Sequence, residues 1–241
     1  KGLCIIAAGF KETGAEGAEA EKQLLAKVRE YGMRCVGPNC LGVVNTHPDI
    51  RMDGCFAESL PERGNIGFVS QSGALGGGIL NILKDLNLGF AQFISIGNQA
   101  YVNAETALEY WENEADVEQI LLYMESIQNP ANFRKLASRI SRKKPILALK
   151  AGRSAAGASA ASSHSGSLAG ADKAANALLA QSGVIREYSL KDLLATAKDF
   201  ANCPIPKGNR VTNITNSGGP AIKATEAECE PGMQKAKNSD A

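Results

Sequence analysis

Three polar features of the sequence each come directly after an apolar run that is typical of a buried strand. They are the segment Ser70-Gln71-Ser72-Gly73, the carboxylate Glu125, and the segment 151–168, which is almost entirely alanine, serine and glycine and contains His164. Parallel α/β sheets bind ligands at the carboxyl ends of their strands. We therefore expect the three features to meet at one sheet edge and to form a site.

The residue types at this edge would suit the transfer of a phosphoryl group. Ser70-Gln71-Ser72-Gly73 comes just before a predicted helix, and the free N–H groups at a helix N-terminus attract anions. His164 would act as a nucleophile or a base, and Glu125 would fix the tautomer of its imidazole. A phosphoryl group on the imidazole would then be held by the helix N–H groups.

Each feature also has an ordinary structural interpretation. Serine is a favoured helix cap whether or not an anion binds. A carboxylate at a strand end, such as Glu125, usually faces water or caps the backbone of a loop. The segment 151–168 has the composition of a mobile surface linker, in which His164 would be incidental. The residues alone leave both interpretations open.

A second turn, Gly37-Pro38-Asn39-Cys40, also follows a predicted strand. Proline fixes one backbone φ and glycine permits close approach, so Asn39 and Cys40 are placed to face a ligand. The alternative is a tight structural turn. No histidine is near Cys40 in the sequence to activate it, which argues against a catalytic cysteine. The other histidine, His47, lies in a polar turn and is interpreted as a surface residue.

The composition excludes several classes of protein. The 241 residues include 26 Lys+Arg and 25 Asp+Glu, which gives a net charge of +1. A nearly neutral chain lacks the excess of basic residues that is typical of a nucleic-acid-binding protein. No apolar run approaches the ~20 residues that span a bilayer. The six cysteines form no C-x-x-C pair and neither histidine has ligand spacing, so we expect no metal site. Free cysteines indicate a reducing, cytoplasmic setting.

The elements that must position these residues alternate regularly between strand and helix. Strands are predicted at Ile66–Val69, Phe90–Ile96, Gln119–Met124, Ile146–Lys150 and Val184–Arg186, and helices at Gly73–Leu86, Ala104–Asn113, Ala131–Arg142, Ala169–Ser182 and Leu190–Ala201. Such alternation is typical of a parallel sheet with helices on both faces. We expect one complete α/β domain here.

The two ends of the chain carry shorter α/β pieces. The first is a strand at Leu3–Ala7, a helix at Ala15–Tyr31 and a strand at Arg34–Val36, which is too little to bury a sheet. The last is a single strand at Arg210–Thr215 with the start of a helix. We therefore expect the chain to be a fragment of a longer gene product.

Four motifs occur in the order and rough spacing of one known family. They are Gly37-Pro38-Asn39-Cys40, Gly67-Phe68-Val69-Ser70-Gln71-Ser72-Gly73, Lys150-Ala151-Gly152-Arg153-Ser154 and Ser163-His164-Ser165-Gly166-Ser167-Leu168-Ala169-Gly170. The sequence resembles the NDP-forming acyl-CoA synthetases, in particular the α part of ADP-forming acetyl-CoA synthetase, which is related to the succinyl-CoA synthetase α subunit. The resemblance extends to about Glu228.

The resemblance implies three parts of the chain. Residues 1–60 would be the C-terminal half of a Rossmann-like CoA-binding domain, and residues 61–203 a complete flavodoxin-like, doubly wound parallel-sheet domain. Residues 204–241 would be the first β–α unit of a third α/β domain.

The resemblance also implies roles for residues. His164 would be the phosphohistidine, Glu125 the carboxylate that orients it, and Ser70-Gln71-Ser72-Gly73 the phosphate-holding helix start. Pro38-Asn39-Cys40 would lie near the thiol end of CoA, and Gly9-Phe10 would flank CoA.

The reaction implied is acyl-CoA + phosphate + ADP ⇌ acid + CoA + ATP, through an acyl phosphate and then phospho-His164. ATP, ADP and Mg²⁺ would be handled by an ATP-grasp β subunit or fused domain, and this chain would bind no metal. The full-length protein would be an oligomer, and the fragment alone would be inactive.

Two other functions remain open. Similar domains occur in protein acetyltransferases, where they form a regulatory module that senses CoA or acyl-CoA; those relatives often lack the phosphorylatable histidine, so His164 favours the enzyme. A flavodoxin-like domain that binds another phosphorylated ligand is the third possibility.

Overall fold

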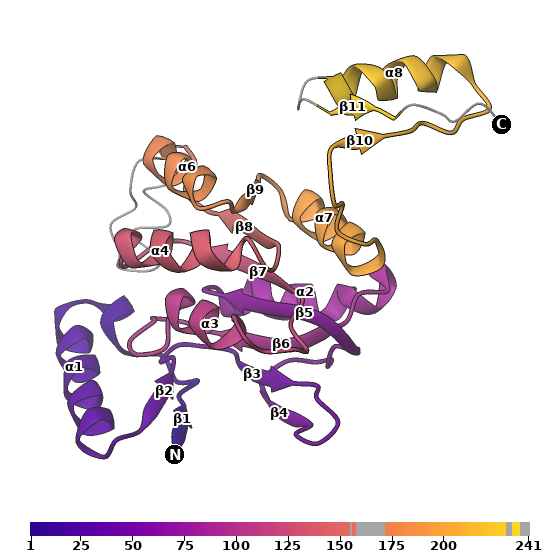
Figure 1. The fold of residues 1–241 in the computed structure, drawn as a ribbon. Coiled ribbons are helices and arrows are strands. Elements are labelled where there is room, and N and C mark those ends of the chain that lie inside the picture. The colour runs from indigo at the N-terminus through magenta and orange to yellow at the C-terminus, as the bar shows by residue number, and fades with distance from the viewer. Residues whose placement is uncertain (155, 158–171, 230–232, 237–241) are drawn as a thin grey trace. The chain divides into compact units, whose positions relative to one another are not determined.

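The computed structural model describes residues 1–154, 156–157, 172–229 and 233–236 (Figure 1). The chain divides into two compact units, Lys1–Asn202 and Cys203–Ala241. The smaller unit contains β10 (Arg210–Val211), α8 (Gly218–Cys229) and β11 (Gln234–Lys235), with the two strands parallel. No helix within the described ranges has the length and apolar character needed to cross a membrane.

The larger unit contains a seven-stranded sheet with the order β4-β3-β6-β5-β7-β8-β9. The strands are β3 (Gly42–Asn45), β4 (Met52–Cys55), β5 (Arg63–Ser70), β6 (Phe90–Ser95), β7 (Gln119–Met124), β8 (Ile146–Lys150) and β9 (Ile185–Glu187). The helices that follow its strands are α2 (Gly73–Leu86), α3 (Ala104–Trp111), α4 (Pro130–Ile140), α6 (Asp172–Gln181) and α7 (Leu190–Asn202). The five strands from β5 to β9 are mutually parallel, which confirms the predicted α/β class.

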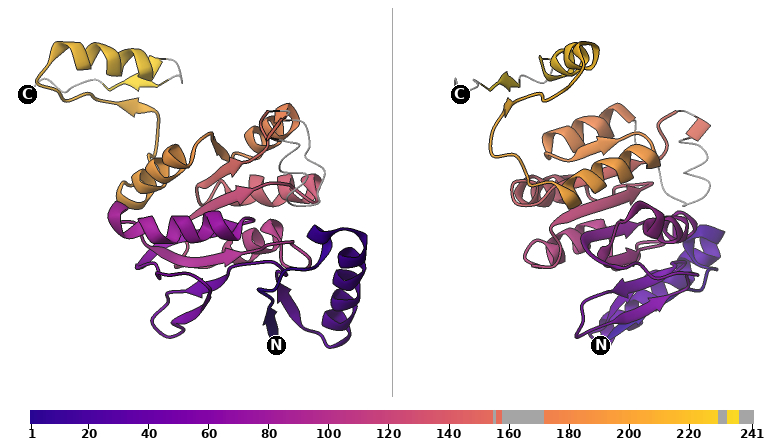
Figure 2. Two further views of the ribbon diagram at one scale, coloured as in Figure 1. Left: turned by 180° about the vertical axis from the view of Figure 1, so that it is seen from behind. Right: turned by 90° about the vertical axis from the view of Figure 1, so that its right-hand side faces the viewer.

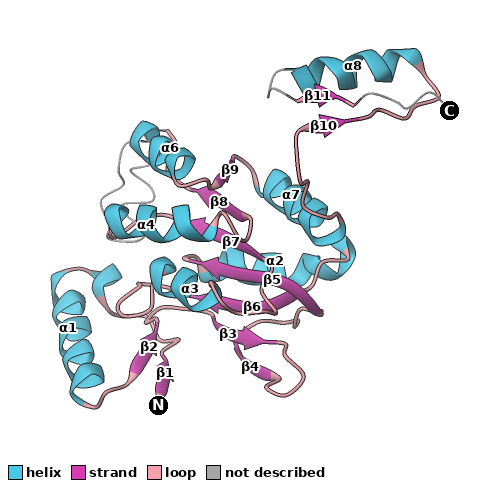
Figure 3. Cartoon of the chain, viewed as in Figure 1, coloured by secondary structure: helices cyan, strands magenta, loops and turns pink. Residues whose placement is uncertain are grey.

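Helices cover both faces of this sheet (Figures 2 and 3). Side chains alternate along β7, so Ile120 and Leu122 lie in one apolar core with residues of α3, α4 and α6, while Leu121 lies in the other core with residues of α2 and α7. A strand buried on both faces reads as a continuous apolar run, which is why it was recognisable in the sequence. The doubly wound arrangement is therefore confirmed.

The sheet is mixed rather than wholly parallel, which differs from the sequence prediction. The hairpin β3–β4 pairs antiparallel to β6, and no strand was predicted between residues 42 and 55. The hairpin was missed because both strands are short and β4, Met52-Asp53-Gly54-Cys55, is largely exposed, so it lacks a hydrophobic pattern. The strands β3 and β4, which lie within the predicted first domain of residues 1–60, thus extend the main sheet. The predicted boundary between the first and second domains, at residues 60 and 61, stays a prediction.

One glycine fixes the geometry of this hairpin. Gly42 has φ +125°, and a Cβ there would lie 2.1 Å from the carbonyl oxygen of Gly54. We expect Gly42→Ala to lower the free energy of unfolding by roughly 1–3 kcal/mol, because it combines a left-handed φ with a clash against backbone. Gly54→Ala is the matched control, since its Cβ would make ordinary 3.5 Å contacts with Val43. Urea denaturation of both variants tests this; equal stability of the two would contradict it.

The chain begins with a two-stranded parallel sheet and a helix. These are β1 (Gly2–Cys4), the short 3₁₀ helix η1 (Lys11–Thr13), α1 (Ala15–Glu30) and β2 (Arg34–Val36). β1 is shorter than the predicted strand at Leu3–Ala7. Two backbone hydrogen bonds nevertheless lie beyond its end: the Ile5 N–H donates to the Val36 carbonyl oxygen at 3.0 Å, and the Asn39 N–H donates to the Ala7 carbonyl oxygen at 2.9 Å.

Candidate functional site

The register of the sheet brings the carboxyl ends of four strands to one edge. Ser70 on β5 lies opposite both Ser95 on β6 and Tyr123 on β7, and Met124 on β7 lies opposite Lys150 on β8. Glu125 and the start of the segment 151–168 therefore share an edge with Ser70, as the sequence predicted.

Gln71 ties two of these strand ends together. Its side-chain oxygen accepts hydrogen bonds from the backbone N–H groups of Glu125 at 2.7 Å and Ser126 at 3.0 Å, and its amide nitrogen donates to the Ser126 hydroxyl at 3.1 Å. Its own N–H donates to the Tyr123 carbonyl at 3.1 Å. These contacts occupy the Gln71 side chain, so its observed role is to position the Glu125 loop.

The N-terminus of α2 has the serine cap that the sequence allowed. The Ser72 hydroxyl accepts from the Leu75 N–H at 3.3 Å, and the buried Ser70 hydroxyl donates to the Ser72 carbonyl at 2.6 Å. The first helical turn contains no acidic residue. The N–H groups of Gly73 and Ala74 precede the first intrahelical bond, so they point outward at the positive end of the helix dipole.

Glu125 is only 7% exposed and shares its surroundings with a buried cation. Lys150 is 5% exposed, and its amine donates to the Ala151 carbonyl at 2.5 Å. Burial and then the Arg186 cation lower the pKa of Lys150, while Asp172 and Glu125 oppose that shift. Burial and the Glu125 charge raise the pKa of Tyr123. The carboxylate thus sits in an environment of low dielectric, where charges act strongly.

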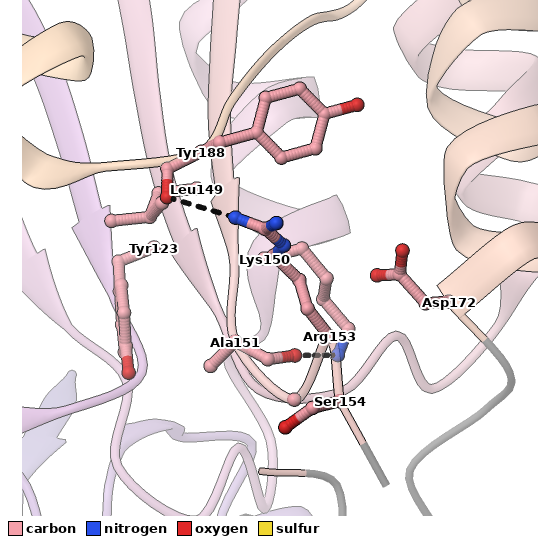
Figure 4. Close-up of a pocket in the computed structure, with 9 residues that line it drawn as sticks. Tyr123, Leu149, Lys150, Ala151, Arg153, Ser154, Asp172 and Tyr188 are labelled. Atoms are coloured by element: carbon pink, nitrogen blue, oxygen red, sulfur yellow. Dashed lines mark hydrogen bonds between the residues drawn. The ribbon is translucent and has the colours of Figure 1, made fainter.

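A pocket of about 570 Å³ opens beside the end of β8 (Figure 4). Tyr123, Lys150, Arg153, Ser154, Asp172 and Tyr188 are among its lining residues. The guanidinium carbons of Arg153 and Arg186 lie 4.9 and 5.1 Å from the centroid of the Tyr188 ring, and Arg186 pairs with Asp172. Two basic residues, Lys150 and Arg153, and one acidic residue, Asp172, line the pocket, so its wall is cationic.

His164 lies outside the described residues. Its pairing with Glu125 therefore stays a prediction. Ser154, which precedes His164 in the sequence, and Asp172, which follows it, both line the pocket beside β8.

The candidate CoA turn contacts the loop that follows β6. The Asn39 amide donates to the Asn98 side-chain oxygen at 3.2 Å, and the Asn98 N–H donates to the Pro38 carbonyl at 3.0 Å. A Cβ on Gly97 would lie 2.3 Å from the carbonyl oxygens of Pro38 and Asn39, so only glycine allows this approach. Cys40 is 5% exposed. The turn thus lies at the same edge as Ser70.

Gly9 and Phe10 belong to a loop that is held by Glu12. Both N–H groups donate to one Glu12 oxygen, at 2.6 and 3.1 Å. The Asn98 amide donates to Glu12 at 2.5 Å and to Glu21 at 2.9 Å. Burial acts to raise the pKa of Glu12, but the hydrogen bonds from Asn98, Gly9 and Phe10 outweigh it and lower that pKa. This network fixes the loop to the main sheet.

Sequence reasoning missed the loop after β6 and the charged groups of the pocket. Asn98 and Gln99 are both buried, and Gln99 accepts from the Gln128 amide at 3.1 Å through its carbonyl oxygen. The signal was present, because Gly97-Asn98-Gln99 follows an apolar strand just as Ser70 and Glu125 do. Over the described part of the chain, no group of His, Cys, Asp and Glu is arranged to hold a metal ion.

The sequence matches the family described as "Succinyl-CoA ligase like flavodoxin domain" over residues 63–200, which is more than half of the chain. The chain belongs to this succinyl-CoA ligase-like flavodoxin family. The matched range begins with β5 and ends within α7, so it covers the helices and strands that carry Ser70, Glu125 and Lys150.

Several relatives of this chain are named as ADP-forming CoA ligases. The chain is 42% identical over 98% of its length to the α subunit of acetate–CoA ligase [ADP-forming] II from Pyrococcus furiosus, covering 51% of that protein. It is 40% identical over 94% of its length to 4-hydroxybutyrate–CoA ligase [ADP-forming] from Nitrosopumilus maritimus, covering 33% of it.

A solved structure is similar over the whole chain. It is the dinucleotide forming acetyl-coenzyme A synthetase 1 of Candidatus Korarchaeum cryptofilum in complex with phosphate and ADP, with a TM-score of 0.90 and 34% identity, covering 100% of this chain and 51% of that one. These findings confirm the resemblance to NDP-forming acyl-CoA synthetases. The chain spans about half the length of the α subunits that it matches.

Proposed function

We propose that the chain is the α part of an ADP-forming acid–CoA ligase that works through a phosphohistidine at His164. The observation that carries this is the shared sheet edge, where the α2 N-terminus, the Glu125 loop and the turn of Asn39 lie together. The relatives reported above are named as ligases, which favours the enzyme over a regulatory module. A cytoplasmic setting, expected from the free cysteines, is part of this proposal.

The reaction divides into three transfers. Phosphate, held by the N–H groups of Gly73 and Ala74, attacks the thioester carbonyl, and CoA leaves as its thiolate. The His164 imidazole then attacks the phosphorus of the acyl phosphate, and the free acid leaves as its carboxylate. The phosphoryl group finally passes from His164 to ADP, with Mg²⁺, on an ATP-grasp subunit or domain.

The residues of this chain have distinct tasks in these transfers. Glu125 stabilises the positive charge that develops on the imidazole, and Gln71 holds the Glu125 backbone in place. The turn of Pro38, Asn39 and Cys40 lies near the thiol end of CoA, and the loop of Gly9 and Phe10 flanks CoA. The Ser70 and Ser72 hydroxyls shape the helix start.

The phosphate step can be tested at a single N–H group. Gly73 is the first helical residue of α2, where proline is tolerated because its missing N–H has no intrahelical partner. We expect Gly73→Pro to keep the helix but to weaken the binding of inorganic phosphate about tenfold, since it removes one charge-assisted hydrogen bond. An NMR titration of the chain with phosphate measures this.

Gly73→Ala is the matched control, because it adds a Cβ at an ordinary 3.5 Å contact with Leu41 and keeps the N–H. Its affinity for phosphate should equal that of the unmodified chain. Absence of shifts at residues 71–74 in the unmodified chain would contradict the phosphate site. Equal affinities for the proline and alanine variants would contradict the role of the Gly73 N–H.

A further inference from the structure

Two cysteines that the proposed reaction does not use as nucleophiles lie side by side. Cys4 ends β1 and is exposed, and Cys40 lies in the turn after β2 with 5% exposure. Their sulfur atoms are 3.8 Å apart and share a hydrogen bond. The Cys40 thiol also lies 3.3 Å from the Ile5 carbonyl oxygen. The two cysteines are 36 positions apart in the sequence, and the contact between their sulfur atoms brings the two ends of this segment together.

The contact between the two sulfur atoms shifts the pKa values of the two thiols in opposite directions. It lowers the pKa of Cys4 to about 7, against the effect of burial. The same contact, together with burial, raises the pKa of Cys40, so Cys40 keeps its proton, and its thiol donates to the Ile5 carbonyl oxygen. Burial raises the pKa of Cys35, and raises that of Cys55 to about 11. Cys4 is therefore an exposed thiol whose lowered pKa favours the reactive thiolate form.

We propose that Cys4 and Cys40 are a redox-sensitive pair that forms a reversible disulfide by exchange with a low-molecular-weight disulfide. The proposal rests on the contact between the two sulfur atoms and on the exposure of only one of them. It does not depend on the proposed function, because disulfide formation is measured by the mass of the chain and not by its catalytic turnover.

The exchange proceeds in two balanced steps. The Cys4 thiolate attacks one sulfur of the external disulfide RSSR, forms a mixed disulfide and expels RS⁻. Cys40 then gives its proton to solvent and attacks the Cys4 sulfur, which expels the second RS⁻. Two protein thiols are oxidised and one external disulfide is reduced to two thiols. The sulfur atoms must close from 3.8 Å to ~2.05 Å.

The crosslink would tie the end of β1 to the turn that carries Asn39. That turn is already joined to the chain after β1 by the bond from the Asn39 N–H to the Ala7 carbonyl oxygen. The disulfide would therefore reinforce a contact that exists in the reduced chain. An effect on CoA would follow only where the proposed function holds.

The experiment treats the reduced 241-residue chain with oxidised glutathione at pH 7, followed by intact mass and peptide mapping. The expected product is lighter by the two thiol hydrogens, joins Cys4 to Cys40, and returns to the starting mass with dithiothreitol. Cys40→Ser should stop at a glutathione adduct on Cys4, and Cys4→Ser should form no crosslink. Cys203→Ser, which removes another exposed thiol, should behave as the unmodified chain.

The rate of alkylation at Cys4 tests the hydrogen bond separately. Cys40→Ala removes the hydrogen-bond partner of Cys4 and should slow the reaction about fivefold, because the loss of thiolate outweighs the gain in nucleophilicity. Cys40→Ser keeps a hydrogen-bond partner and should keep the rate. A glutathione adduct that persists on Cys4 of the unmodified chain, a crosslink from Cys4 to Cys35, or no reaction at Cys4 would overturn the proposal.

Discussion

His164→Ala should abolish both phosphoryl labelling and net turnover in the full-length protein with its ATP-grasp partner. The reason is chemical: alanine has no atom that can accept the phosphoryl group, so neither half of the reaction can pass it on. The measurement is incubation with γ-labelled ATP, followed by mapping of the labelled peptide. The label on the unmodified protein should be acid-labile and base-stable, as a phosphorus–nitrogen bond is.

His47→Ala is the matched control for this result, because it removes the only other histidine of the chain. His47 lies in the turn before β4, and its imidazole nitrogens lie 3.9 Å from Asp49 and 3.5 Å from Asp116. We expect labelling of this variant to be unchanged. Label that survives His164→Ala, or that maps to His47, would refute the assignment. The chain without an ATP-grasp partner should take up no label.

The shared edge of Ser70, Glu125 and Lys150 could be predicted because it follows from one rule. Each residue ends an apolar run that is buried on both sides, and parallel strands in register bring their carboxyl ends together. The helix that follows Ser72 could be predicted for a similar reason, since serine caps and a 3–4 spacing of leucines mark it locally. None of these inferences needed a contact between distant residues.

The contacts that hold the site together could not be predicted. Gln71 reaches the N–H groups of Glu125 and Ser126, more than fifty residues away in the sequence. The Asn98 amide donates to Glu12 and Glu21, which are 86 and 77 positions away in the sequence. Such bonds depend on side-chain conformations that the fold selects, and a hydrophobic pattern carries no information about them.

The same limit applies to Gln71, whose place in the phosphate site stays a prediction. A polar residue just before a helix is equally compatible with an anion ligand and with a bond to a neighbouring loop. The structure has the second contact, through both the oxygen and the nitrogen of the amide. The hairpin β3–β4 was missed for another reason, because an edge strand that is mostly exposed has no periodic apolar side chains.

Glu125→Gln should keep the fold and strongly reduce phosphoenzyme formation. The substitution is nearly isosteric, and it leaves intact the hydrogen bond from the backbone N–H of residue 125 to Gln71. A neutral amide, however, no longer stabilises the imidazolium-like charge that develops on His164 as phosphorus is attacked. The expected loss is about 10²–10³-fold in the rate of labelling, measured by rapid quench with labelled ATP.

Gln71→Leu separates the charge of Glu125 from its position. Leucine cannot accept from the N–H groups of Glu125 and Ser126, so the carboxylate is kept but its backbone is released. We expect a smaller loss of labelling than for Glu125→Gln, together with lower stability, because one buried and one part-buried N–H group lose their acceptor. If Glu125→Gln labels at the unmodified rate while His164→Ala does not label at all, Glu125 has no part in the transfer. In that case His164 must draw its stabilisation from another group at this edge, and the cationic pocket formed by Lys150 and Arg153 is the nearest place to look.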